Sequence, residues 1–91
     1  METEELTYID TLDFIEQCRN DHIYIYGIER FLIEDDRLVP DLGGILDASN
    51  VLDQGFEKTI QAARWYLSNY GEEVNERFCI VFDRELRGHL T

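Results

Sequence analysis

The chain has few positive charges and few of the residue types that build reactive or metal-binding sites. Its 91 residues include eight Lys and Arg, two His, two Cys and one Pro. Neither His22 nor His89 belongs to an H-x-x-x-H or C-x-x-C pattern, so we expect no zinc site. Cys18 lies on an apolar stripe with no evident orienting partner, which favours a structural thiol over a nucleophile. The sequence therefore predicts a protein that is not an enzyme and that has no catalytic residue, metal or cofactor.

Long apolar runs are also missing. No segment approaches the roughly 20 apolar residues that cross a bilayer, and the acidic start METEELTYID lacks the basic region of a secretory signal. We expect a cytoplasmic protein with reduced thiols and no membrane contact. Apolar residues make up 44% of the chain, which opposes intrinsic disorder. The length fits a single domain over residues 1–91.

What the chain does have is negative charge, gathered in one part of the sequence. The net charge is −12, and the first 57 residues hold fifteen Asp and Glu against three Arg. From Lys58 onward acids and bases balance. An excess of this size is typical of a surface that steers a basic partner. It also disfavours direct binding to nucleic acid or anionic lipid, because both are negatively charged.

Hydrophobic periodicity predicts the element order α-β-β-β-α-β. A first helix is capped by Thr7 or Thr11 and runs to about Asn20. The second helix is capped by Asp53 and ends at Gly71. The expected strands are residues 22–28, 29–34, 37–42 and 77–83, with a turn at Asp35–Asp36, a loop over 43–50 and the last strand in the centre of the sheet. Pro40 indicates that the third strand lies at an edge or ends there.

These elements indicate an α+β fold with a four-stranded mixed or antiparallel sheet and both helices on one face. Alternation then directs Ile23 and Ile25 toward the helices. The opposite face is expected to carry Tyr24, Tyr26 and part of the acidic hairpin.

Aromatic rings beside carboxylates are what a protein-binding surface needs, since the rings supply buried area and the acids steer. The candidate partner-binding residues are Tyr24, Tyr26, Asp35, Asp36, Asp41, Asp47 and Asp53. Two other interpretations of the acidic cluster, which consists of Glu34, Asp35, Asp36, Asp41, Asp47 and Asp53, stay open. It can be a solvated hairpin and loop, or a site for Mg²⁺ or Ca²⁺, although the order of its residues does not fit a calcium loop.

The segments IYIYG, ERFLIEDDRLVPDL, AARWYLSNYG and FCIVF together resemble bacterial immunity proteins of the immunity protein 40 type. The resemblance implies a protein made beside a toxin of a polymorphic toxin system, which it neutralises by binding. An acidic surface suits this role, because it can occupy the cationic cleft of a nuclease toxin as a phosphate mimic.

Three alternatives remain. A phage-type nucleic-acid mimic that inhibits a DNA- or RNA-binding effector would have the same composition. A small metal-binding regulator would use the Asp and Glu cluster, and a subunit of a larger assembly would be acidic for solubility only. The sequence leaves open whether the free protein is a monomer or a dimer.

Overall fold

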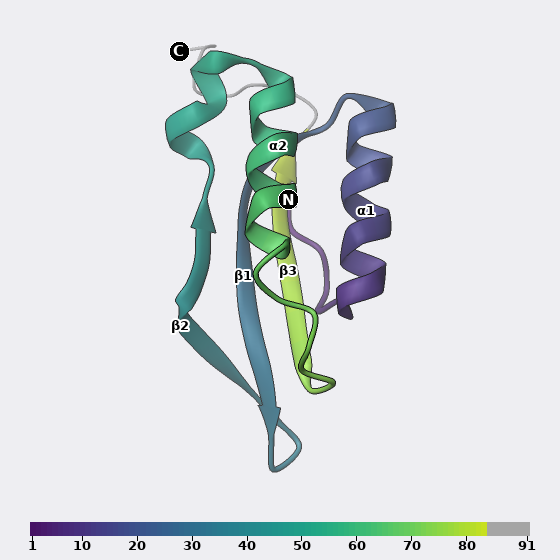
Figure 1. Ribbon diagram of the computed structural model, residues 1–91, viewed down its shortest axis with the longest axis vertical. Helices are drawn as coiled ribbons and strands as arrows, with labels where there is room; N and C mark the ends of the chain where they lie inside the picture. The colour runs from purple at the N-terminus through teal and green to yellow at the C-terminus, as the bar shows by residue number, and fades with distance from the viewer. Residues whose placement is uncertain (84–91) are drawn as a thin grey trace.

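The computed structural model describes residues 1–83 and shows a small sheet with two helices beside it (Figure 1). The elements follow the order α1, β1, β2, the 3₁₀ helix η1, α2 and β3. Their bounds are Tyr8–Asp21, Tyr24–Glu34, Arg37–Asp47, Ser49–Gln54, Phe56–Leu67 and Glu76–Asp83, respectively. Neither α-helix among these residues has the length and apolar character that a bilayer crossing requires.

The sheet has three strands in the order β2-β1-β3, and both strand pairs are antiparallel. The α+β class is confirmed, but the predicted four-stranded sheet is wrong. Residues 22–28 and 29–34 were expected to be separate strands, whereas Tyr24–Glu34 forms the single strand β1. The predicted central position of the last strand is also wrong, because β1 lies between β2 and β3.

Gly27 accounts for the difference between the two predicted strands and the single strand β1. A glycine after an apolar segment is typical of a strand end, but Gly27 lies inside β1 and pairs with both Asp47 and Val81. A Cβ atom on Gly27 would lie 2.8 Å from the backbone oxygen of Leu46. The glycine therefore permits a close approach of β2 and does not end the strand.

Strand β2 is longer than predicted and reaches Asp47, through the residues expected to form a loop. Its pairing jumps from Arg30↔Asp41 to Glu29↔Ile45, so Leu42, Gly43 and Gly44 form a bulge. The position of β2 at an edge of the sheet, predicted from Pro40, is confirmed. The bulge lets the strand resume its pairing after the two glycines.

Helix α1 begins where the sequence predicts, because the Thr7 side chain accepts a hydrogen bond of 3.2 Å from the Asp10 amide. It ends at Asp21, followed by His22 in the left-handed conformation with φ 57°. His22 was expected in a strand, but it caps the helix and stacks on the ring of Phe56.

Helix α2 differs more from the prediction. Gly55 and not Asp53 is its N-cap residue, and Asp53 lies within η1. The helix ends at Leu67, before the predicted end at Gly71.

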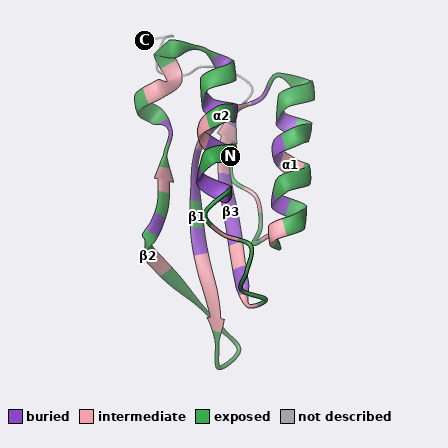
Figure 2. Ribbon diagram, in the orientation of Figure 1, coloured by how far each residue is buried: buried purple, intermediate pink, exposed green. Residues whose placement is uncertain are grey.

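The core lies between the sheet and the helices, which share one face of the sheet (Figure 1). Ile25 and Ile28 of β1 are fully buried there with Phe78 and Ile80 of β3. The helices contribute Ile15, Cys18, Ile60, Ala63 and Leu67. Figure 2 shows buried residues concentrated in the centre of this layer, while the β1–β2 hairpin extends beyond the helices and is mostly exposed.

The amino-terminal segment pairs with the outer edge of β3, which the sequence analysis did not predict. The amide of Leu6 donates to the carbonyl oxygen of Phe78 over 2.7 Å, and the Phe78 amide donates back over 2.8 Å. Isolated bridges join Glu2 to Val81 and Leu6 to Phe78. Residues 1–6 thus cover the edge that β3 would otherwise expose.

Candidate binding surface

The tip of the β1–β2 hairpin is a tight acidic turn. Asp35 and Asp36 have φ values of 50° and 62°, which are the left-handed conformations of a type I′ turn. Aspartate tolerates this conformation better than most residues, and it leaves both carboxylates exposed. The hairpin turn predicted at these residues is confirmed.

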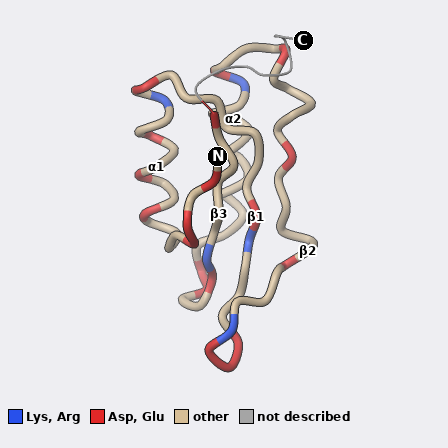
Figure 3. The backbone as a smooth tube through the Cα atoms, turned by 180° about the vertical axis from the view of Figure 1, so that it is seen from behind, with Lys and Arg blue, Asp and Glu red and all other residues tan. Residues whose placement is uncertain are grey.

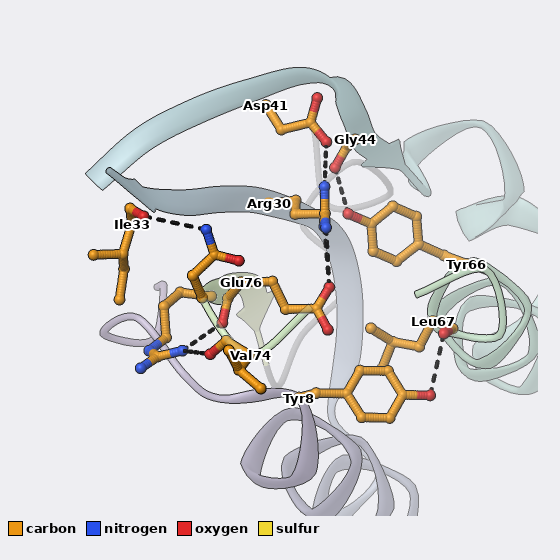
Figure 4. Close-up of polar contacts among 11 residues, drawn as sticks. Tyr8, Arg30, Ile33, Asp41, Gly44, Tyr66, Leu67, Val74 and Glu76 are labelled. Atoms are coloured by element: carbon orange, nitrogen blue, oxygen red, sulfur yellow. Dashed lines mark hydrogen bonds and ion pairs between the residues drawn. The ribbon is translucent and has the colours of Figure 1, made fainter. Parts of the chain in front are cut away.

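Asp41 belongs to an internal ion cluster and not to the exposed acids. Its Oδ2 accepts a hydrogen bond of 2.7 Å from Nη1 of Arg30. Arg30 also donates from Nε and Nη2 to Oε1 of Glu76, over 3.2 and 3.1 Å (Figure 4). The guanidinium carbon lies 4.5 Å from the centre of the Tyr70 ring. Burial of Arg30 opposes its charged form, but the bonds to Asp41 and Glu76 prevail and raise its pKa.

The bulge in β2 closes over this cluster. The hydroxyl of Tyr66 on α2 donates to the carbonyl oxygen of Gly44 (Figure 4). A Cβ atom on Gly44 would lie 2.7 Å from Oδ2 of Asp41 and 3.0 Å from Cβ of Arg30. Burial raises the pKa of Tyr66, which keeps its hydroxyl a donor. These contacts anchor the hairpin to α2.

The second face of the sheet has no helix on it, and we call it the bare face. Strand alternation places residues of β1 and their partners there, opposite the buried Ile28 and Arg30. The register places Glu29, Phe31, Pro40, Ile45, Asp47, Arg77, Cys79 and Val81 there. Tyr26, at the register shift of β1, lines a groove on the same face. Ile45 is 53% exposed, although it is a large apolar residue. Exposed apolar side chains among carboxylates are typical of a protein-binding surface.

A shallow groove of about 260 Å³ lies on the bare face. Tyr26, Ile45 and Val81 supply apolar lining, and Glu29 and Asp47 add carboxylates. Asp47 also accepts hydrogen bonds from the side chain and amide of Ser49, which lower its pKa. Asp47 therefore carries its charge at neutral pH at the border of an apolar strip.

The two predicted tyrosines have different surroundings. Tyr26 lines the groove of the bare face. The Tyr24 ring instead packs edge-on against Phe56, at 5.6 Å between ring centres, and against His22. Tyr24 therefore belongs to the border of the core.

The seven predicted residues do not form one patch. Asp35 and Asp36 occupy the hairpin tip, whereas Asp53 lies in η1 at the opposite end of the molecule (Figure 1). Figure 3 shows acidic residues along α1, the amino-terminal segment, β2 and the tip. The structure brings Tyr26 and Asp47 together on the bare face and separates them from the other five.

Sequence reasoning missed several residues that the structure singles out. Glu29 and Ile45 border the groove, and Ile45 was assigned to a loop. Trp65 on α2 is 69% exposed. The helical repeat was the available signal for this exposure, because Trp65 precedes the core-facing Tyr66 and so lies off the buried stripe. The pairing of Arg30 with Glu76, 46 residues apart, had no local signal.

Within residues 1–83, no group of three or more His, Cys, Asp or Glu side chains is placed to hold a metal ion. His89 lies outside the described residues. Comparisons of the chain with protein-family models, with curated proteins and with solved structures found no match.

Proposed function

We propose that this chain is a non-catalytic acidic protein that binds a cationic protein through its bare face. One observation carries the proposal: an uncovered apolar strip containing Ile45 and Tyr26 is bordered by the carboxylates of Glu29 and Asp47. The strip supplies area that loses contact with water on binding. The carboxylates select a positively charged partner and speed its approach.

The particular role that we propose is that of a cognate immunity protein, which occludes the cationic cleft of a nuclease-like toxin. The resemblance to immunity proteins and the net charge of −12 support this role. The acidic hairpin tip extends beyond the helices (Figure 1), so it can enter a cleft that a flat surface would not reach. No reaction step is assigned to the chain.

The proposal places a gene for a toxin beside the gene for this chain, and the test uses the toxin domain that this neighbour encodes. Asp35→Asn with Asp36→Asn removes the tip charges, and asparagine tolerates the left-handed turn that lysine would strain. We expect association with the toxin domain to slow by about tenfold at low salt, because the tip contributes to steering. Stopped-flow measurements across a salt series give the rate and its salt dependence.

A matched control removes the same charge elsewhere. Asp13→Asn with Glu57→Gln neutralises one exposed acid on each helix and should slow association far less. A third variant, Ile45→Ser, should accelerate dissociation because it removes apolar area from the bare face. Equal slowing by both charge pairs, with no effect of Ile45→Ser, would contradict docking through the bare face and the tip.

A further inference from the structure

A second cavity lies on the other side of the sheet, between the start of α1 and the loop that leads into β3. Its volume is about 700 Å³, within the range of small-ligand sites. Tyr8, Ile9 and Leu12 line one wall, and Gly71, Val74 and Glu76 line the other. The charged side chains of Glu73 and Arg77 also belong to the lining. We call it the α1 groove.

Three apolar side chains of the α1 groove are exposed without an evident structural reason. Ile9 is 68% exposed, Leu12 is 37% exposed and Val74 is 94% exposed. Side chains of this size on two facing walls offer a lining for the aliphatic part of a ligand.

The walls are held in place, so the groove exists before any ligand arrives. Gly71 has φ 109°, and a Cβ atom there would lie 2.8 Å from Cζ of Tyr8, so the loop rests directly on the tyrosine ring. The Tyr8 hydroxyl donates to the carbonyl oxygen of Leu67 over 3.2 Å. On the loop, Nδ2 of Asn75 donates to the carbonyl oxygen of Ile33 over 3.2 Å. A preformed site loses less conformational entropy on binding.

The polar feature of the α1 groove is a buried carboxylate with an unused acceptor. Glu76 is 1% exposed, and its Oε1 takes both hydrogen bonds from Arg30. Its Oε2 has no hydrogen-bond donor among the residues described. Figure 4 shows this second oxygen on the side of the carboxylate that faces Tyr8, which also lines the groove. An unpaired buried acceptor costs free energy that a bound donor would recover.

The charges around this oxygen also favour a cation. Arg30 is the only positive side chain hydrogen-bonded to the carboxylate of Glu76 in the described part of the chain, and it is shared with Asp41. One cation thus faces two carboxylates. The Arg77 guanidinium donates to the carbonyl oxygens of Val74 and Glu76, and it makes no ion pair within residues 1–83. A second positive group would balance the buried cluster.

We propose that the α1 groove binds an arginine side chain of a partner protein. The guanidinium donates to Oε2 of Glu76 and stacks on the Tyr8 ring, while the aliphatic stem lies on Ile9, Leu12 and Val74. Guanidinium suits the site better than ammonium, because it is more weakly hydrated and stacks on aromatic rings. The groove lies on the helix side of the sheet, so this inference does not depend on docking through the bare face.

The experiment titrates the intact protein with N-acetyl-arginine methylamide and follows its amide resonances by NMR. We expect shifts confined to residues 7–12 and 71–77, with a dissociation constant of roughly 1 mM, as the ligand efficiency of a small molecule allows. The citrulline analogue has the same shape without the charge and should bind at least about tenfold more weakly. A third titration uses the corresponding lysine compound. Tighter binding of the lysine compound than of the arginine compound, or equal binding of the citrulline and arginine compounds, overturns the proposal.

Two variants locate the site. Glu76→Gln keeps an oxygen for Arg30 and replaces Oε2 by a donor, so arginine binding should be lost. Val74→Arg places a competing guanidinium at an exposed position and should also abolish binding, whereas Leu42→Arg makes the same charge change on the exposed bulge of β2 and should not. If Glu76→Gln fails to fold, the comparison of the two arginine variants decides. Unchanged binding by Val74→Arg overturns the assignment.

Discussion

The covered and bare faces of the sheet share the same three strands but are stabilised by different means. On the covered face, Ile28 and Phe78 are fully buried against the helices, and hydrophobic burial dominates. On the bare face, Ile45 and Glu29 are exposed. The face that holds the fold together thus differs from the face available for a partner.

A similar contrast runs along β1. The half of the strand near Ile25 lies under the helices, whereas beyond Arg30 the hairpin extends past them (Figure 2). Between these two halves of β1, the main stabilising contacts are the ion pairs of Arg30 with Asp41 and Glu76 and no longer apolar packing. A projecting acidic hairpin can thus be anchored at its base by an ion cluster and by one hydroxyl of α2, that of Tyr66.

The largest expected effect compares two phenylalanines on opposite faces. Phe78→Ala should lower the free energy of unfolding by about 3–5 kcal/mol, because a fully buried ring leaves a cavity in the core. Phe31→Ala, in the neighbouring strand on the bare face, should cost less than half as much, since its ring is only half-buried. Urea unfolding of both variants gives the two values. Equal losses would show that the bare face is covered after all.

The second effect concerns the ion cluster. Arg30→Met should cost about 3 kcal/mol, because it leaves the buried carboxylate of Glu76 without its cation. Amide hydrogen exchange should show the loss of protection concentrated in residues 31–42.

The matched control for this prediction is Arg64→Met, which breaks an exposed ion pair with Glu16 and should change stability very little. A uniform loss of protection over the whole sheet in Arg30→Met would contradict a local anchoring role. Adding Glu76→Gln to Arg30→Met should restore part of the loss, because it removes the unpaired charge.

The smallest effect distinguishes the two thiols. Burial, with a contribution from Asp21, raises the pKa of Cys18 to about 12. Burial, with contributions from Glu5, Glu2 and Glu29, raises the pKa of Cys79 to about 11. Both thiols are protonated at neutral pH, so alkylation should be slow and should accelerate about tenfold per pH unit below these values.

At a given pH the thiolate fraction of Cys79 is about tenfold larger, so iodoacetamide should modify it first. The single-thiol variants Cys18→Ala and Cys79→Ala separate the two rates by mass spectrometry. Faster modification of Cys18 would mean that the covered face opens more readily than the bare face.

Local signals predicted the helices and the turn, because they depend on neighbouring residues. The Thr7 cap and the turn at Asp35–Asp36 lie where the sequence indicates, and a second helix forms in the predicted region although its two ends differ. The predicted number of strands was wrong at Gly27, and the predicted end of the third strand was wrong at Gly43–Gly44. A glycine that ends a strand and a glycine that admits a neighbouring backbone look the same in sequence.

The candidate site was less predictable than the fold. Whether Asp41 is free or paired depends on Arg30, and the exposure of Ile45 depends on the bulge that returns β2 to the sheet. The two-residue spacing of Tyr24 and Tyr26 predicts that both rings lie on one face of the sheet. The pairing of β1 with β3 shifts register between Ile25 and Gly27, so this spacing does not hold there. Tertiary pairing therefore decided which residues lie on the bare face.

The amino-terminal segment on β3 has a consequence for the behaviour of many copies in solution. With residues 1–6 occupying one lateral border of the sheet, addition of a foreign strand is left to β2. There Pro40 lacks an amide donor, and the protrusion at Leu42–Gly44 interrupts the ladder. Within residues 1–83, growth into fibres by strand addition is thus hindered at both lateral borders of the sheet.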